Sequence, residues 1–414
     1  RPAAQRGQSL LKQLSDLYSP LLSRGLVAPE GYSPVKIHGV ISLDKAGGII
    51  EIRPVSKKGW DTLHVPSQKV RSNSISPYFL CDTYKYLLED GERRKASAQL
   101  HKQLLDGVDS PAAKAVCAFF DRHFDADPVS QDKVKYVFEY GGCFIHDDPE
   151  IVRAWMDRPS SGGDVGRCCI TGEIGPLVES HPKIKGVPGT ITLGGTAVSY
   201  NLDSTESFGL ERSANAPIGE KTAFAYSSAL NYLLSKRSRR WLYSNLALLC
   251  WAKDGDPAYQ NAFFNMLFPP RNLEGPDIVS AMLSAGYLTT SDGELLSRDM
   301  PVFVLGVSGN SGRVAFPLFC RATFGELLDR FSSYHARMQI PHPPWEPEFI
   351  TLLDILNEIS GPGHNQYAPM PLVYALIRSI VDGTEYPRLL YSLVIARHKP
   401  GRVSASIIQL FIKE

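Results

Sequence analysis

The stretch NLALLCWA, residues 245–252, places the strongest constraint on the fold because it is apolar throughout. A short run of this kind favours a strand that is buried in a sheet. Two more segments of strand type, VFVLGVS (302–308) and RVAFPLFC (313–320), flank the turn sequence GNSG. We predict a β-hairpin here. The distorted Gly-x-Ser-x-Gly spacing in GVSGNSG does not favour a nucleophile elbow, because an elbow needs a helix after the turn.

Hydrophobic periodicity predicts further elements along the chain. A second hairpin is expected where VKIHGVISL and GIIEIRPV enclose DKAGG, and more strands are expected at 133–141 and in GTAVSYN. Ser110 and Asp148 each precede a proline, which is typical of a helix N-cap followed by the first helical position. The expected helices are 9–22, 78–90, 93–107, 110–124, 148–157, 217–237 and 323–339.

The pattern changes after IPHPPWEPEF (340–349), which holds four prolines and is interpreted as a linker. Every later segment has helical periodicity, and the expected helices are 350–360, 371–382, 387–398 and 401–412. The sequence therefore predicts an α+β protein. Its larger region, 1–345, contains mixed sheets, and its smaller part, 346–414, is all helical.

Composition excludes several classes of protein. The 414 residues include 44 basic and 43 acidic side chains, so the formal charge of +1 lacks the basic excess of many nucleic-acid binders. The seven cysteines are odd in number and irregularly spaced, which favours reduced intracellular thiols over a disulfide framework. No apolar run approaches the roughly 18 residues that span a bilayer. We expect a cytoplasmic protein that makes no membrane contact.

Cysteine and histidine gather in one stretch, at Cys143, His146, Cys168, Cys169 and His181. A structural zinc site needs two spaced pairs of ligands, and the adjacent Cys168 and Cys169 are poorly placed for the second pair. Cys168 with His181 has the composition of a thiol–imidazole pair, but no third residue is evident to orient it. Buried free thiols are the favoured interpretation, so we predict no metal, no cofactor and no catalytic residue.

Three basic segments remain as candidate sites for nucleic acid. HPKIKGV directs Lys183 and Lys185 to the same side if it is extended, and the nearby Gly194 and Gly195 would allow close approach of the backbone to a phosphate. Basic side chains suit phosphate contact, whereas Asn and Ser can reach base edges. The other two segments supply Lys69, Arg71, Asn73 and Ser74 in a loop, and Lys236, Arg237, Arg239 and Arg240 after a helix.

Several of these segments also carry a family resemblance. In chain order they are SNSISPYFLCDTYKYLL, CCITGEIGPLVESHPKIKGVPG, GGTAVSYNLDSTESFG, NAPIGEKTAFAYSSALNYLL and VFVLGVSGNSGRVAFPLF. Together they resemble the large subunit of the type I-C CRISPR surveillance complex, Cascade, over nearly the whole chain, from about residue 9 to 414.

The resemblance implies a protein without catalytic activity. Such a subunit would lie at the 5′ handle of the guide RNA, recognise the protospacer-adjacent motif (PAM) in double-stranded DNA, help to open the duplex and support the displaced strand. It would bind a handle-capping subunit, a backbone subunit and a small subunit, and would recruit a helicase–nuclease. Members of the family look longer, so we expect their terminal small-subunit-like helical bundle to be missing from this sequence.

The assignment of PAM contact to the loop 69–76 and to the segment 183–196 comes from their chemistry, not from the resemblance. In this interpretation Lys183 and Lys185 neutralise phosphate, Asn73 and Ser74 approach a base edge, and Arg237, Arg239 and Arg240 bind nucleic-acid backbone. Two alternatives remain open. One is a Cys/His-dependent hydrolase or metal nuclease that uses the 143–181 cluster. The other is an assembly protein that never contacts DNA.

Overall fold

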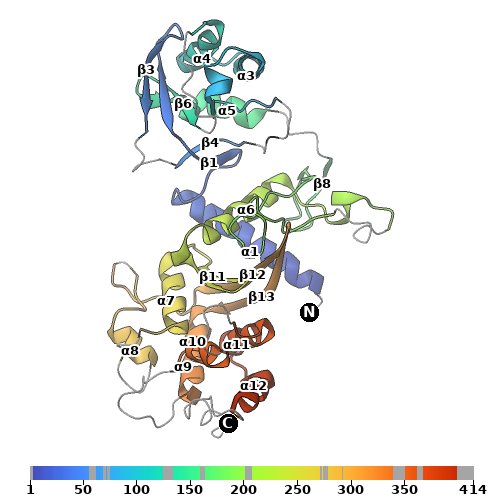
Figure 1. Ribbon diagram of the computed structural model, residues 1–414, viewed down its shortest axis with the longest axis vertical. Coiled ribbons are helices and arrows are strands. Elements are labelled where there is room, and N and C mark those ends of the chain that lie inside the picture. Colours follow the sequence, from blue (N-terminus) through green and yellow to red (C-terminus); the bar gives the residue numbers. More distant parts are fainter. Residues whose placement is uncertain are drawn as a thin grey trace. The chain divides into compact units, whose positions relative to one another are not determined.

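The computed structural model describes residues 3–55, 62–68, 71, 75–124, 134–158, 164–200, 208–270, 273, 278–290, 292–338, 350–360 and 367–398. Contacts divide the chain into two units (Figure 1). The first combines residues 1–24 with 165–414, and the second is residues 25–164. Helices and sheets occur in both, so the predicted α+β class is confirmed.

The unit 25–164 contains a mixed sheet in the order β3-β2-β6-β5, with β7 paired to β6 and with β2 parallel to β6. A separate two-stranded sheet joins β1 to β4. The strands are β1 (Tyr32–Lys36), β2 (Gly39–Leu43), β3 (Ile49–Pro54), β4 (Thr62–Pro66), β5 (Cys81–Thr83), β6 (Lys135–Tyr140) and β7 (Cys143–Phe144). The helices are α2 (Tyr84–Leu87), α3 (Glu92–Leu105), α4 (Pro111–Asp121), the 3₁₀ turn η2 (Ile145–Asp147) and α5 (Pro149–Asp157).

Successive residues of the central strands bury opposite faces of this sheet. Ile41 and Phe138 join the core that α3, α4 and α5 cover, whereas Val40 and Val137 join a smaller cluster with residues of β4 and β5. This is the two-residue period of a strand with both faces partly covered. The predicted hairpin is confirmed, because β2 pairs with β3 in antiparallel register.

Two predicted helix caps are confirmed in this unit. The Ser110 hydroxyl accepts hydrogen bonds from the N–H groups of Ala112 and Ala113, and the Asp148 carboxylate does the same for the first turn of α5. A proline follows each cap at the first helical position, where a backbone N–H group would have no partner within the helix. Asp148 therefore has a structural role.

The second unit is built on a four-stranded antiparallel sheet in the order β10-β11-β12-β13. Its strands are β10 (Arg240–Tyr243), β11 (Leu246–Ala252), β12 (Pro301–Asn310) and β13 (Arg313–Thr323), and a separate pair joins β8 (Val165–Arg167) to β9 (Ile174–Pro176). Its helical elements are α1 (Ala3–Ser23), η4 (Arg212–Asn215), α6 (Glu220–Ser235), η5 (Arg237–Arg239), α7 (Pro257–Leu267), α8 (Ile278–Ser284), α9 (Phe324–Met338), α10 (Leu352–Ser360), α11 (Met370–Asp382) and α12 (Arg388–His398).

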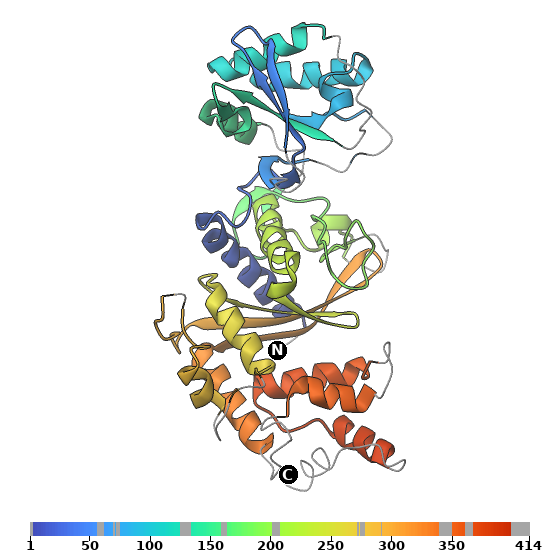
Figure 2. The ribbon, with the colours of Figure 1, turned by 60° about the vertical axis from the view of Figure 1, so that its left-hand side comes forward.

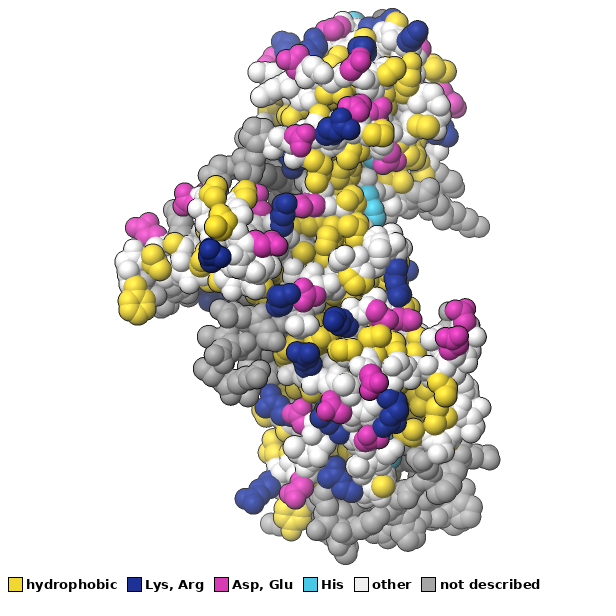
Figure 3. Space-filling model, turned by 180° about the vertical axis from the view of Figure 1, so that it is seen from behind, with side chains coloured by type: hydrophobic (Ala, Val, Ile, Leu, Met, Phe, Trp, Pro, Cys, Tyr) yellow, Lys and Arg dark blue, Asp and Glu magenta, His cyan; other side chains and the backbone are white. Residues whose placement is uncertain are grey.

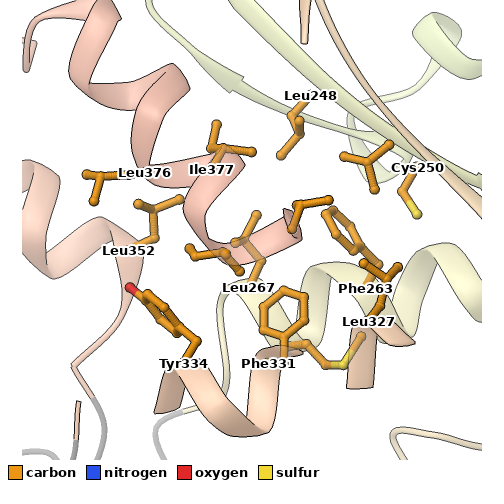
Figure 4. Close-up of a cluster of buried hydrophobic side chains, with 14 of the residues drawn as sticks. Leu248, Cys250, Phe263, Leu267, Leu327, Phe331, Tyr334, Leu352, Leu376 and Ile377 are labelled. Atoms are coloured by element: carbon orange, nitrogen blue, oxygen red, sulfur yellow. The ribbon is translucent and has the colours of Figure 1, made fainter. Parts of the chain in front are cut away.

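Strand β11 is buried at every position, as its apolar sequence predicted. Helices α1 and α6 pack side by side on one face of the sheet, and α7, α9 and α11 lie on the other (Figures 1 and 2). Leu248 and Cys250 of β11 project into the large core on the second face, where Figure 4 shows them near Phe263 of α7. The C-terminal helices α10, α11 and α12 contribute to this same core.

Two predicted elements were wrong. The segment 78–90 is not one helix, because Cys81–Thr83 pairs with β6 as β5 and only Tyr84–Leu87 is helical. Backbone pairing there is reinforced by the buried carboxylate of Asp82, which accepts hydrogen bonds from the N–H groups of Tyr78 and Thr83. GTAVSYN forms only isolated bridges in its described part, from Gly195 to Ile184 and from Thr196 to Arg313, and does not extend along a sheet edge.

The predicted boundary near residue 346 lies outside the described residues, as do the linker 340–349 and the helix expected at 401–412. On either side of that linker, α9 and α10 contribute side chains to one core. None of the helices in the described ranges has both the length and the apolar character that crossing a membrane requires.

The shared core yields a stability prediction. Leu376 of α11 is fully buried (Figure 4), so Leu376→Ala should lower the free energy of unfolding by about 2–5 kcal/mol through lost burial and a residual cavity. The matched control is Leu389→Ala in α12, where the leucine is 39% exposed and the expected loss is below about 1 kcal/mol. Urea denaturation measures both variants, and equal losses would show that α11 does not share the core.

Candidate nucleic-acid interface

The segment 180–200 holds its two lysines on a closed turn of backbone. Ile184 and Gly195 exchange two hydrogen bonds, with N–O distances of 2.7 and 3.0 Å, which joins the start of the segment to its end. Ile184 is fully buried between Lys183 and Lys185, which are both exposed. Burial of Ile184 thus turns the neighbouring lysine side chains outward together, as the alternation of an extended chain requires.

Asn231 of α6 fixes the backbone that carries these lysines. Its side-chain oxygen accepts from the N–H of Lys185 at 2.8 Å, and its side-chain nitrogen donates to the carbonyl of Lys183 at 3.1 Å. One amide side chain therefore satisfies a donor and an acceptor two residues apart, as a neighbouring strand would. The lysine segment is anchored to a helix that itself packs on the main sheet.

The same segment docks on the tip of the β12–β13 hairpin. The N–H groups of Ile191 and Thr196 donate to carbonyls of the tip, and the tip residues Ser311 and Val314 donate back, over distances of 2.9–3.0 Å. Ser311 takes a φ of +54°, a left-handed conformation that is uncommon outside glycine. Because its N–H and carbonyl both bond to the docked segment, the two parts stabilise each other's backbone conformation.

Glycine makes this docking sterically possible. A Cβ atom on Gly194 would lie 2.4 Å from the carbonyl oxygen of Ile184, and one on Gly189 would lie 2.3 Å from that of Gly309. Gly194 and Gly195 had been predicted to let backbone N–H groups approach a phosphate closely. Both N–H groups instead donate within the protein, to Ile191 and Ile184. These two glycines therefore shape the turn that carries the lysines.

The second basic cluster follows α6 and connects to this turn. Arg240 donates to the carbonyl of Gly186 at 2.5 Å. Arg239 stacks on the ring of Tyr232, with its guanidinium carbon 3.7 Å from the ring centroid, and donates to the Tyr232 carbonyl. Burial, together with the nearby Arg237, lowers the pKa of Arg240. Of the four predicted side chains, Lys236 and Arg237 are exposed, whereas Arg239 and Arg240 are partly buried. Arg240 binds the turn, and Arg239 binds the end of α6.

The third predicted cluster belongs to the unit 25–164. Lys69, Asn73 and Ser74 lie outside the described residues. The guanidinium of Arg71 lies between two tyrosine rings, 3.8 Å from the centroids of Tyr78 and Tyr86, and pairs with the buried Asp82.

Arg71 also donates to the carbonyl of Ser76 at 2.6 Å. It therefore anchors the end of the loop that contains the predicted base-reading residues. Its guanidinium is held by protein groups, so its described contacts support a positioning role rather than the nucleic-acid contact that residue type alone suggested.

Charge is otherwise mixed over the surface. On the face drawn in Figure 3, basic and acidic side chains are interspersed, in keeping with the balance of 44 against 43. Attraction to a polyanion would therefore depend on local groups held in a fixed arrangement. The turn with Lys183 and Lys185, to which Arg240 is bonded at Gly186, is such a group within its unit.

The residues of the enzymatic alternative have other partners. The ring nitrogen Nδ1 of His181 lies 2.6 Å from the hydroxyl of Tyr226, and the Sγ atom of Cys168 lies 3.6 Å from Oγ1 of Thr222. Burial lowers the pKa of His181 to about 4. Burial raises the pKa of Cys168, but hydrogen bonds from Gly219 and from the turn at Thr171 lower it by more. The pKa of Cys168 therefore falls to about 7.

Cys168 as a residue is only 3% exposed, which restricts access of a substrate to it. Cys143 and His146 belong to the unit 25–164, whereas Cys168, Cys169 and His181 belong to the other unit. In the part of the chain that the structure describes, no group of three or more His, Cys, Asp or Glu side chains could hold a metal ion.

Sequence reasoning missed Asn231 and the hairpin tip at Ser311–Arg313. A single asparagine within an otherwise good helix carries no distinctive signal. The tip did have a sequence signal, since Arg313 follows a Gly-Asn-Ser-Gly turn. Only the three-dimensional docking brings this tip to the lysine segment.

A comparison with family models identifies the class of protein to which this fold and site belong. Residues 14–412 match the model described as CRISPR-associated protein (Cas_Csd1). The chain therefore belongs to the Cas_Csd1 family of type I-C Cascade subunits, which confirms the resemblance found in the sequence. A comparison with curated proteins finds no match.

The docking geometry predicts a selective effect at one glycine. Gly194→Ala should destabilise the protein by at least about 1 kcal/mol more than Gly293→Ala, which thermal and urea denaturation can measure. Both glycines have φ above +80°, but only the Cβ at Gly194 meets backbone, whereas nothing lies within 4 Å of that at Gly293. Equal losses would mean that the 184–195 contact is not closely packed.

Proposed function

We propose that this Cascade subunit recognises the PAM in double-stranded DNA, helps to open the duplex, supports the displaced strand and recruits the helicase–nuclease. It does so without breaking covalent bonds itself. In this proposal it lies in the cytoplasm at the 5′ handle of the guide RNA, next to the handle-capping, backbone and small subunits. Membership of the Cas_Csd1 family supports a place in a Cascade complex. The exposed Lys183 and Lys185 support the proposed binding of nucleic-acid backbone.

The observation that carries the proposal is the anchored turn of Lys183 and Lys185. Two exposed ammonium groups stand on a backbone fixed by Asn231 and by Gly195, so little conformational entropy of the main chain is lost on binding. Lysine neutralises phosphate without reading sequence. This suits a protein in a complex where guide pairing reads the target and protein groups read only the PAM and the backbone.

The loop 69–76, which includes Arg71, is assigned the reading of the PAM. Arg71 is fixed by Asp82, by two tyrosine rings and by its hydrogen bond to the carbonyl of Ser76. Asn73 can donate and accept at a base edge, and Ser74 can do either. The two units thus divide the work, with backbone contact at 183–185 and base contact at 73–74.

Backbone contact is tested by salt dependence. In the assembled complex, replacing Lys183 and Lys185 together by Ala should weaken binding to a target duplex and flatten the plot of log K against log [salt] by about 2 units, near 0.9 per lost phosphate contact. Lys253→Ala, at an exposed lysine outside the turn, is the control and should leave the slope unchanged. A slope that stays unchanged in the double variant would show that the two lysines are only solvated.

Base contact is tested by competition between duplexes that carry the PAM or a mutated PAM. Asn73→Ala should reduce the affinity ratio of the two duplexes by about 10-fold or more, because one good base contact contributes roughly 1–3 kcal/mol of discrimination. The lysine double variant should lower both affinities and leave their ratio intact. If the unaltered complex binds both duplexes equally, PAM recognition is excluded, and the reading as a pure assembly protein is favoured.

A further inference from the structure

A pocket of about 900 Å³ lies beside the anchored lysine turn, within one unit of the fold. The segment 179–200 supplies one wall and the β12–β13 hairpin tip supplies the other. Its lining residues include Glu179, His181, Lys183, Tyr200, Asn310 and Arg313. This volume is within the range of pockets that bind small molecules or a single unit of a polymer.

One residue that lines this pocket, His181, has a buried polar atom without a partner. His181 is 4% exposed, and its Nδ1 atom is engaged by Tyr226, but its Nε2 atom has no hydrogen-bond partner among the described residues. A buried ring nitrogen without a partner is costly, so its retention needs an explanation. A ligand that reaches this nitrogen would remove the cost.

The remaining lining groups define the chemistry of that ligand. Lys183 and Arg313 are cationic, against one carboxylate from Glu179, so the pocket favours a group with negative charge. Tyr200 offers a half-buried ring whose orientation is fixed by the hydrogen bond from its hydroxyl to the carbonyl of Ala216 at 2.9 Å. A flat ring, a hydrogen-bonding edge and a phosphate are together the parts of a nucleotide.

We propose that this pocket receives one unstacked nucleotide of single-stranded nucleic acid. The base packs against Tyr200 and makes a hydrogen bond with His181, while Lys183 and Arg313 face the phosphate. This inference rests on the proposed function, and it adds to it a site that holds a separated strand after the duplex opens or holds the guide RNA. RNA and DNA both carry the base and the phosphate that the pocket would bind, and the experiment below distinguishes between them.

The test uses the full chain and two labelled ten-nucleotide probes of the same base sequence, one RNA and one DNA, with binding followed by fluorescence anisotropy at low salt. Ser180→Trp places an indole on an exposed lining residue and should weaken binding to at least one probe by about 10-fold. Leu193→Trp is the matched control, because Leu193 is 62% exposed and does not line the pocket, and it should change neither affinity more than twofold.

The two probes report the source of the nucleotide. If Ser180→Trp weakens the binding of RNA alone, the pocket is assigned to the guide RNA. If it weakens the binding of DNA alone, the pocket is assigned to the displaced strand. If it weakens the binding of both probes, the pocket accepts nucleotides with either sugar. If Ser180→Trp binds both probes as Leu193→Trp does, the proposal is overturned. In that case, a salt slope that still flattens in the lysine double variant would leave the proposed function standing.

A second pair of variants keeps the test decisive should Ser180→Trp fail to fold. Tyr200→Phe retains the ring and loses only the hydrogen bond to Ala216, whereas Tyr200→Ala removes the ring. Stacking predicts that Tyr200→Ala weakens binding by about 10-fold and that Tyr200→Phe changes it less than threefold. Equal affinities for the two variants would contradict a role for the ring in binding.

Discussion

The contact between backbone and backbone at Gly194–Gly195 is the interaction on which the proposed interface depends. A Cβ atom on Gly194 would lie 2.4 Å from the carbonyl oxygen of Ile184, so only glycine fits at this position. This approach closes the turn that carries Lys183 and Lys185, and it leaves the β12–β13 tip free to bond to Ile191 and Thr196. The cationic groups therefore owe their placement to uncharged neighbours, which explains how a chain with a formal charge of +1 could still offer a site to phosphate.

The elements that form the interface extend from the core of the larger unit. Strand β12 runs from the buried core, where Val304 packs with residues of α9 and α11, out to the exposed tip at Asn310. Helix α6 likewise packs against β11 and presents Asn231 to the lysine turn. The site is therefore assembled from the ends of rigid elements, which favours a fixed arrangement of side chains. The pocket that includes His181 and Tyr200 lies at the same junction.

The sequence predicted much of the fold because apolar periodicity is a local signal. The all-apolar β11, the hairpin around Asn310 and the capped helix after Ser110 could each be read from a few neighbouring residues. The prediction of a strand at GTAVSYN failed because its described bridges are isolated, from Gly195 to Ile184 and from Thr196 to Arg313, and periodicity does not encode such contacts. At the site, the type of Lys183 and Lys185 was informative, but the structural engagement of Arg71, Arg240 and the glycine N–H groups was not visible, since it depends on residues distant in sequence.

The central claim is that the lysine turn has its shape before nucleic acid arrives. Hydrogen–deuterium exchange of the full chain without nucleic acid, resolved at the amides of Ile184, Gly195 and Thr196, tests this claim most directly. All three amides donate to carbonyls within the protein. The account predicts exchange at least ~100-fold slower than that of an unstructured peptide, because each bond must open before its proton is lost. Exchange at the unstructured rate would mean that the turn forms only on binding, and the account of a preformed cationic site would be wrong.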